Sequence, residues 1–319
     1  MPMIDRTGAL ALIPEPIAQE IISGVRRQSV AMSLLRRLPN MTSGTQRQPV
    51  LSMLPAADFV NGDAGMKITT NAAWDKKMMV AGEIAAIVPI PQAVIDDSAY
   101  DIWGEVRPLI EEQIGRVFDK QVFEGGNPKA PVEWPKGLIP TAAAVPNIVT
   151  SGTGIDVAAD ISAAMAILEE NGYEVTGIAS QRNLKSMLRD LRNTSGDPIF
   201  TPMTGTVPAG IYGTPTHFVG PGVWAIANAL AIMGDWSLAA YSIRQDITYQ
   251  VFDTGVISDD DGKIIYNLLQ QDMVALRAVV RLAWQVANPI DIDRPFGTGF
   301  PFALLKPAPV TPPDPPGGG

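Results

Sequence analysis

The spacing of hydrophobic and polar positions changes several times along the first half of the chain, and each change predicts a different element. Across residues 15–38, apolar side chains recur near helical spacing, which predicts an extended arm followed by a helix. Residues 46–90 contain short β-like runs around a turn-rich segment at 61–65, a pattern typical of a long hairpin. A hairpin with few core-sized side chains is unstable alone in water, so we expect it to rest on another surface, for which another subunit is a candidate.

A long helix is predicted from residue 96, with Asp96, Asp97 or Ser98 as its N-cap and Gly125-Gly126 at its end. Pro108 would crowd the carbonyl of Gly104, four residues earlier, so the expected helix is kinked but continuous. Its apolar stripe comprises Ile102, Val106, Ile110, Ile114, Val117 and Phe118.

The second half of the chain mixes helical and strand-like patterns. Helices are predicted over 156–170 and after Ser180 as an N-cap, and short strands are predicted over 174–178, 216–219, 224–226 and 231–233. Two longer strands, over 238–252 and 273–286, should pair, with a turn at 259–262 between them. Residues 307–319 hold six Pro and three Gly and are expected to form a tail outside the fold. This order predicts an α+β fold.

Composition excludes most catalytic machinery. The chain has no Cys and a single His, so disulfides, thiol nucleophiles and sites that need two imidazoles are excluded. That residue, His217, has no nucleophile motif nearby and is interpreted as structural. The glycines at 220–222 and the aspartates at 259–261 lack the helix or ligand spacing of nucleotide and calcium loops, and both are interpreted as turns. The sequence predicts no catalytic residue, no cofactor and no metal site.

Charge is distributed unevenly along the chain. The net charge is −9, yet residues 1–50 contain six Arg and only three acidic residues. Four of these arginines recur along the predicted N-terminal helix, where they form either a solvated face or a surface that contacts a polyanion: Arg26, Arg27, Arg36 and Arg37. No apolar stretch approaches the ~20 residues of a membrane span and no signal-peptide pattern is present, so we expect no membrane partner and synthesis in a cytoplasm.

The hairpin also carries candidate contact residues. Trp74 and Met78 are four residues apart and should share one strand face. Such residues ordinarily pack in a core, but in a hairpin without a core of its own they favour contact with a neighbouring subunit. Lys76 and Lys77 lie between them and complete the set of subunit-contact candidates.

The order of these parts resembles the major capsid proteins of tailed bacteriophages, a family that shares its fold with encapsulins and the herpesvirus capsid floor. Local stretches carry the resemblance in the family's order: 118–125, the Leu-Arg-Asp-Leu-Arg run before 196–199, 211–215, 234–237 and 277–289. The resemblance implies a fold with an N-terminal arm, a long β-hairpin E-loop, a P-domain with a spine helix, and a mixed α/β A-domain. Its expected boundaries are 1–45 for the arm, 46–90 for the E-loop, 91–136 for the P-domain with the spine helix, 137–237 for the A-domain, 238–295 for the returning P-domain strands and 296–319 for a Pro/Gly-rich tail.

The resemblance also implies a function and partners. It implies a non-enzymatic subunit that forms hexamers and pentamers of an icosahedral head, assembled in the host cytoplasm and enclosing double-stranded DNA bound without sequence specificity. The N-terminal arginines would then face the interior. The chain starts almost directly at the arm, so the scaffold is expected to be a separate protein or to be absent, and a portal and a possible decoration protein are expected as further partners. An encapsulin-like shell protein is the alternative, and a soluble α+β enzyme is disfavoured by the composition.

Some relatives crosslink their subunits through a Lys–Asn isopeptide bond assisted by a Glu. The matching positions here are Asp272 and Val279, so the amide and the general base are both missing, although Lys67, Lys76 and Lys77 are available in the hairpin. The sequence therefore predicts a shell without autocatalytic crosslinks.

Overall fold

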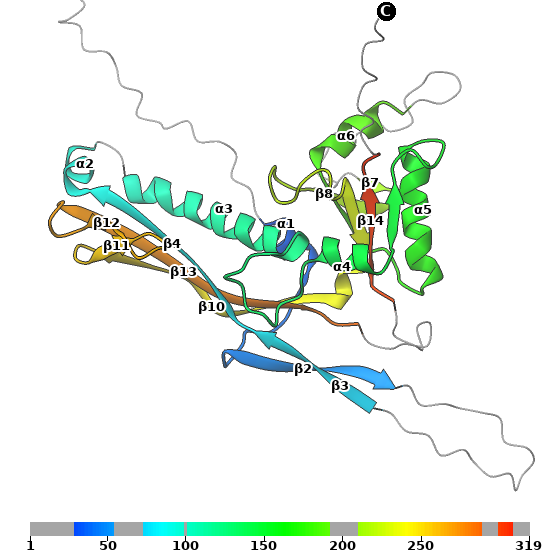
Figure 1. Ribbon diagram of the computed structural model, residues 1–319, viewed down its shortest axis with the longest axis horizontal. Helices are drawn as coiled ribbons and strands as arrows, with labels where there is room; N and C mark the ends of the chain where they lie inside the picture. Colours follow the sequence, from blue (N-terminus) through cyan, green and yellow to red (C-terminus); the bar gives the residue numbers. More distant parts are fainter. Residues whose placement is uncertain (1–28, 54–72, 99–100, 192–209, 289–298, 309–319) are drawn as a thin grey trace, which may run out of the picture.

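The computed structural model describes residues 29–53, 73–98, 101–191, 210–288 and 299–308. Figure 1 shows an elongated molecule in which a long helix, α3, lies along a four-stranded sheet. A second, six-stranded sheet with its helices lies at one end, and a two-stranded hairpin projects from the body.

Two long strands form the centre of the four-stranded sheet, whose order is β1-β10-β13-β4. Strand β10 (Ala239–Phe252) is antiparallel to β13 (Met273–Val286), which confirms the predicted pairing. Strand β4 (Gly82–Pro91) continues the sheet on the other side of β13, and the two-residue β1 (Arg36–Arg37) runs parallel to β10.

Helix α3 (Ile102–Phe123) covers one face of this sheet because its apolar stripe meets alternate residues of β13. On the strand, Leu276, Ala278, Val280, Leu282 and Trp284 are buried. On the helix, Ile110, Ile114 and Phe118 are buried, whereas Val117 is 42% exposed and was wrongly included in the predicted stripe.

The start of the long helix differs from the prediction. Residues Gln92–Asp97 form a separate short helix, α2, and Ser98 is extended with φ −77° and ψ 130°. Asp101 is the true N-cap of α3, since its Oδ1 accepts a hydrogen bond from Gly104 N at 3.0 Å. The predicted end is confirmed: Glu124 is the C-cap, and Gly125 and Gly126 follow with φ of 69° and 78°.

The projecting hairpin consists of β2 (Thr45–Met53) and β3 (Ala73–Val80). The predicted hairpin range of 46–90 is too long, because β4 pairs with β13 and not with β2. The base of the hairpin is held to the body: Trp134 Nε1 donates to Val80 O at 2.7 Å, and Met79 packs with Met41 and Ala283.

The six-stranded sheet has the order β5-β14-β9-β6-β8-β7. Its strands are β5 (Ile148–Thr150), β14 (Phe302–Lys306), β9 (Ala231–Gly234), β6 (Gly177–Ser180), β8 (Thr214–Phe218) and β7 (Gly210–Ile211). Its helices are α4 (Leu138–Ala144), α5 (Val157–Glu170) and α6 (Arg182–Arg189). The helix predicted over 156–170 and the strand over 231–233 are confirmed.

Three predictions for this region are wrong. Ser180 ends β6, and Gln181 is the N-cap of α6. The strand predicted over 174–178 begins three residues later and ends two residues later, as β6. The strand predicted over 224–226 is absent, because these residues lie in the loop between β8 and β9. The range 296–319 is not wholly a tail either. Strand β14 falls within it, is buried from Phe302 to Leu305, and pairs with both β5 and β9.

Three short elements complete the fold. Strands β11 (Val256–Ser258) and β12 (Ile264–Asn267) form a hairpin around the predicted turn at 259–262, and η2 (Trp236–Leu238) precedes β10. Of the predicted helix over 15–38, the described part contains only α1 (Val30–Leu34). Ser29 and Leu35 are extended at its two ends, with ψ of 125° and 143°, because the chain turns there to add β1 to the sheet.

Candidate assembly surfaces

The β2–β3 hairpin has two faces of different character. Opposite residues of an antiparallel pair share a face, so the register places Leu51 with Trp74, Pro49 with Lys76, and Arg47 with Met78 on one side. Trp74 is 65% exposed and Met78 is 44% exposed. This side of the hairpin, which we call the Trp74 face, is therefore an apolar and cationic surface without cover from the described part of the chain.

The four hairpin candidates do not form one cluster. Trp74, Lys76 and Met78 lie on the Trp74 face, whereas Lys77 lies on the opposite side with Met79. Lys76 and Lys77 are both exposed. Side chains alternate between the two faces of a strand, so Trp74 and Met78 share one face while Lys76 and Lys77 lie on opposite faces.

The arginine candidates divide in a similar way. Arg36 and Arg37 form β1 at the edge of the four-stranded sheet, in register with Ala240 and Tyr241, and both are exposed. The prediction that Arg36 and Arg37 lie on a helix face is therefore wrong, because both residues are in a strand. Arg26 and Arg27 lie outside the described residues.

A buried carboxylate on α3 fixes the start of the described chain. Asp119 Oδ1 accepts from Ser29 Oγ at 2.5 Å and from Ala31 N at 3.0 Å, and its Oδ2 accepts from Val30 N at 3.1 Å. Burial raises the pKa of this carboxyl above its ordinary value, while the hydrogen bonds from Ser29, Ala31 and Val30 oppose the rise. Ser29 is the N-cap of α1, and Asp119, from a distant part of the sequence, adds to the cap by accepting the first N–H groups of the helix.

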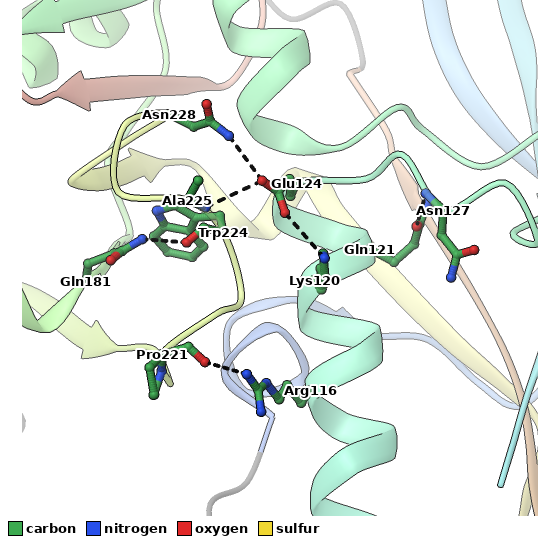
Figure 2. A network of polar contacts seen from close by, with 10 residues as sticks. All are labelled: Arg116, Lys120, Gln121, Glu124, Asn127, Gln181, Pro221, Trp224, Ala225 and Asn228. Atoms are coloured by element: carbon green, nitrogen blue, oxygen red, sulfur yellow. Dashed lines mark hydrogen bonds and ion pairs between the residues drawn. The ribbon is translucent and has the colours of Figure 1, made fainter.

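Polar contacts join the C-terminal end of α3 to the loop over 220–229, as Figure 2 shows. Arg116 Nη2 donates to Pro221 O at 2.9 Å, and Glu124 Oε1 accepts from Asn228 Nδ2 at 3.1 Å and from Ala225 N at 3.4 Å. Gln181 Nε2 holds the same loop by donating to Trp224 O at 2.8 Å. The loop that carries the glycines at 220–222 thus connects β8 and β9 of the six-stranded sheet and docks on the C-terminal end of α3.

The described residues show no group of three or more His, Cys, Asp or Glu side chains that could hold a metal. No helix among them is long and apolar enough to cross a bilayer. His217 lies in β8, where burial lowers the pKa of its imidazole, and Asp260 in the 259–262 turn pairs with Lys129 at 2.7 Å.

Sequence reasoning missed two carboxylates that join distant segments to the end of α3. Asp119 lies in α3 and Glu124 is its C-cap, both stand among other charged residues, and nothing in the helical spacing marks them as different. The weak available signal for Asp119 was its place directly after the buried Phe118, on the edge of the apolar stripe.

A long helix over returning strands, a projecting hairpin and a mixed α/β end unit define the α+β fold of a virus shell subunit. A sequence profile of the phage capsid family matches residues 10–292. The chain belongs to the phage capsid family, whose members are structural subunits of multimeric phage shells.

Individual relatives agree with this assignment. The major capsid protein of Staphylococcus phage 80alpha is 25% identical over 281 residues, which span 86% of this chain and 80% of that protein. A solved structure titled Microbacterium phage Oxtober96 is 36% identical with a TM-score of 0.81, over 96% of this chain and 100% of the other. One titled Mycobacterium phage Cain is 26% identical with a TM-score of 0.81, over 97% and 100% of the two chains.

Proposed function

We propose that this chain is the non-enzymatic subunit that forms the hexamers and pentamers of an icosahedral phage head enclosing double-stranded DNA. Family membership supports the structural role, and the extended shape supports assembly by overlap between neighbouring subunits. The phage relatives favour this function over the encapsulin-like alternative.

The Trp74 face is the observation that carries the proposal. An isolated two-stranded hairpin is marginally stable in water, yet here one projects from the body with a large aromatic side chain 65% exposed. Aromatic anchors that become buried on association contribute strongly to binding. We therefore assign Trp74, Lys76 and Met78 to a contact with a neighbouring subunit, with Lys77 on the reverse side of the same projection.

Electron microscopy and analytical ultracentrifugation of the recombinant protein test this function. The protein is expressed alone and together with a candidate scaffolding protein encoded beside it. Hollow icosahedral particles or six-fold rings are the expected products. Particles of about 34 kDa under every condition would contradict the proposal.

The proposed shell has no autocatalytic crosslinks. Val279 lies in β13 between Thr248 and Ala85 and supplies no carboxylate, and Asp272 at the start of the strand supplies no side-chain amide. Lys67 lies outside the described residues, and the exposed Lys76 and Lys77 have no matching partner at these two positions. Boiled shells should run as a single band of about 34 kDa, and a ladder of multimers would contradict this part of the proposal.

The N-terminal basic region is proposed to face packaged DNA or a separate scaffolding protein. Arg36 and Arg37 support this because both are exposed on the sheet edge, while the rest of the chain is net acidic. Replacing Arg36 and Arg37 with Gln should reduce packaging or scaffold-dependent assembly. Unchanged assembly and unchanged DNA content would reject the contact. A portal and a decoration protein remain expected partners of the assembled head.

A further inference from the structure

An apolar groove lies between α3 and the β10–β13 pair, next to α1. It has a volume of about 640 Å³. Six of its lining residues are apolar and come from four different elements: Met32, Ile114, Ile243, Ile247, Val280 and Leu282. These six side chains, which form the floor of the groove, also belong to the main hydrophobic core or pack against it. Apolar side chains placed in the groove would therefore extend that core.

The rim of the groove is acidic. Glu111 and Glu112 contribute from α3, and Asp246 contributes from β10. Glu111 and Asp246 are exposed, and Glu111 Oε1 accepts a hydrogen bond from Tyr249 OH at 2.7 Å. An occupant with an apolar face and positive charges beside it would match both the floor and the rim.

The described chain begins at the mouth of this groove. Ser29 is itself a lining residue, and its Oγ bonds both to Asp119 at 2.5 Å and to Met32 N at 3.0 Å. Gly115 of α3 lies directly beside Ser29, since a Cβ added there would make an ordinary contact with Ser29 Cβ at 3.4 Å. The 28 residues that precede Ser29 therefore start from a fixed point beside the groove.

The sequence before Ser29 has the required chemistry. Ile17, Ile21 and Val25 recur at helical spacing, and Arg26 and Arg27 follow directly. Along α3, Glu111 and Glu112 lie about one turn, roughly 5 Å, from Gly115. The two arginines, two and three residues before Ser29, are thus within reach of these carboxylates.

We propose that residues 15–28 occupy this groove in their own chain, with Ile17, Ile21 and Val25 on its floor and Arg26 and Arg27 against its acidic rim. This inference goes beyond the shell function and holds for the unassembled subunit. It divides the four N-terminal arginines: Arg26 and Arg27 pair within the chain, and Arg36 and Arg37 stay available to a polyanion.

Engineered cysteines test the docking directly, because the chain has no Cys of its own. A variant with Val25→Cys and Ile247→Cys is oxidised mildly as the unassembled full-length protein. Docking within the chain predicts an intramolecular disulfide, seen as a monomer that migrates faster and has lost both free thiols. The control pair, Val25→Cys with Val132→Cys, places the second thiol on a side chain that is 96% exposed and away from the groove, and should stay reduced.

The other outcomes overturn the proposal. Disulfide-linked dimers would mean that the segment docks on a second copy, and persistence of both thiols, or equal oxidation of the control pair, would mean that it does not dock. Shell formation is scored separately by electron microscopy, so failure of this inference and failure of the shell function are distinguishable.

Trypsin cleavage after Arg26 and Arg27 provides a second measurement that needs no cysteine. Neutralising the rim with Glu111→Gln, Glu112→Gln and Asp246→Asn should speed this cleavage by about fivefold, because the weak ion pairs of Arg26 and Arg27 with the rim are lost. The matched control, Glu169→Gln with Glu170→Gln on the exposed side of α5, should leave the rate unchanged. An unchanged rate in the rim variant would contradict the proposed pairing.

Discussion

Two antiparallel strand pairs in this molecule have opposite surroundings. In β13 every second residue from Leu276 to Trp284 is buried under α3, whereas in β3 five consecutive residues, 74–78, are exposed. Both pairs are antiparallel and both contain register shifts, between Ile243 and Thr248 in β10 and between Leu51 and Met53 in β2, so backbone pairing alone does not distinguish them. The difference shows that β10–β13 is stabilised within the subunit, while the exposed half of β2–β3 has no such cover from the described residues, which is the ground for the proposed contact with another subunit.

The largest loss of unfolding free energy in the isolated subunit is expected where the β10–β13 pair packs against α3. Phe118 is fully buried and lies 6.3 Å from the ring of Tyr241. Phe118→Ala should lower the free energy of unfolding by about 3–5 kcal/mol through the lost burial and the cavity left behind. Urea unfolding of the unassembled protein measures this, with the adjacent and half-exposed Val117→Ala as a control expected to cost less than about 1 kcal/mol.

A smaller loss is expected from the carboxylate that caps α1. Asp119→Ala leaves the N–H groups of Val30 and Ala31 without their acceptor. The expected cost is about 2–3 kcal/mol, since buried unpaired donors are unfavourable. The same urea experiment tests it, and a cost within error of zero would show that α1 does not depend on this cap.

The pH dependence sharpens the role of Asp119. Its pKa is raised by burial, so the folded state holds this proton more tightly than the unfolded chain does. The part of the stability that comes from holding this proton is therefore present at pH below the ordinary Asp pKa, about 3.9, and is lost as pH rises through the raised value. Asp119→Asn removes this titration, so its unfolding free energy should rise relative to wild type across that window. A constant difference between the two proteins would contradict the assignment.

A still smaller loss of unfolding free energy is expected where the 220–229 loop docks on the C-terminal end of α3. Glu124→Gln keeps one oxygen acceptor but loses the charge that strengthens the bonds from Asn228 and Ala225. The expected cost is about 0.5–1 kcal/mol. Hydrogen exchange across residues 220–229 should rise in this variant while exchange in β13 is unchanged, and equal changes in both segments would argue against a local junction.

The smallest effect on the subunit is expected at Trp74. Most of this side chain is already in solvent, so Trp74→Ala should change the unfolding free energy of the unassembled subunit by less than about 0.5 kcal/mol. Urea unfolding beside the Phe118 variant measures the contrast. A cost as large as that of Phe118→Ala would mean that the hairpin is covered by its own subunit.

The covered part of the fold could be predicted from the sequence because its periodicity matches its burial. Two patterns mark side chains that face the core. One is the alternation over 238–252 and 273–286, and the other is the helical stripe at Ile110, Ile114 and Phe118. The exposed hairpin was predictable for the converse reason, since its strands lack the side chains to build a core. Trp74 and Met78 were correctly placed on one face by simple alternation.

What the sequence did not reveal depends on contacts between distant segments. Strand β14 is short, follows a region rich in Pro and Gly, and is buried only because β5 and β9 flank it in space. In the sequence, Asp119 looks like any other acidic residue of a helix, and only its contacts with α1 in the folded chain distinguish it. The start of α3 was misplaced because Asp96, Asp97, Ser98 and Asp101 are all good capping residues, and only the extended backbone at Ser98 selects the last of them.

The most direct test of the assembly surface is sedimentation of the double variant Trp74→Ala with Met78→Ala under conditions in which wild-type protein forms shells. The account predicts a subunit that unfolds like wild type but sediments as single subunits or small oligomers, while Trp74→Phe with Met78→Leu still forms shells. Wild-type shells from the alanine variant would contradict the claim that the Trp74 face holds neighbouring subunits together.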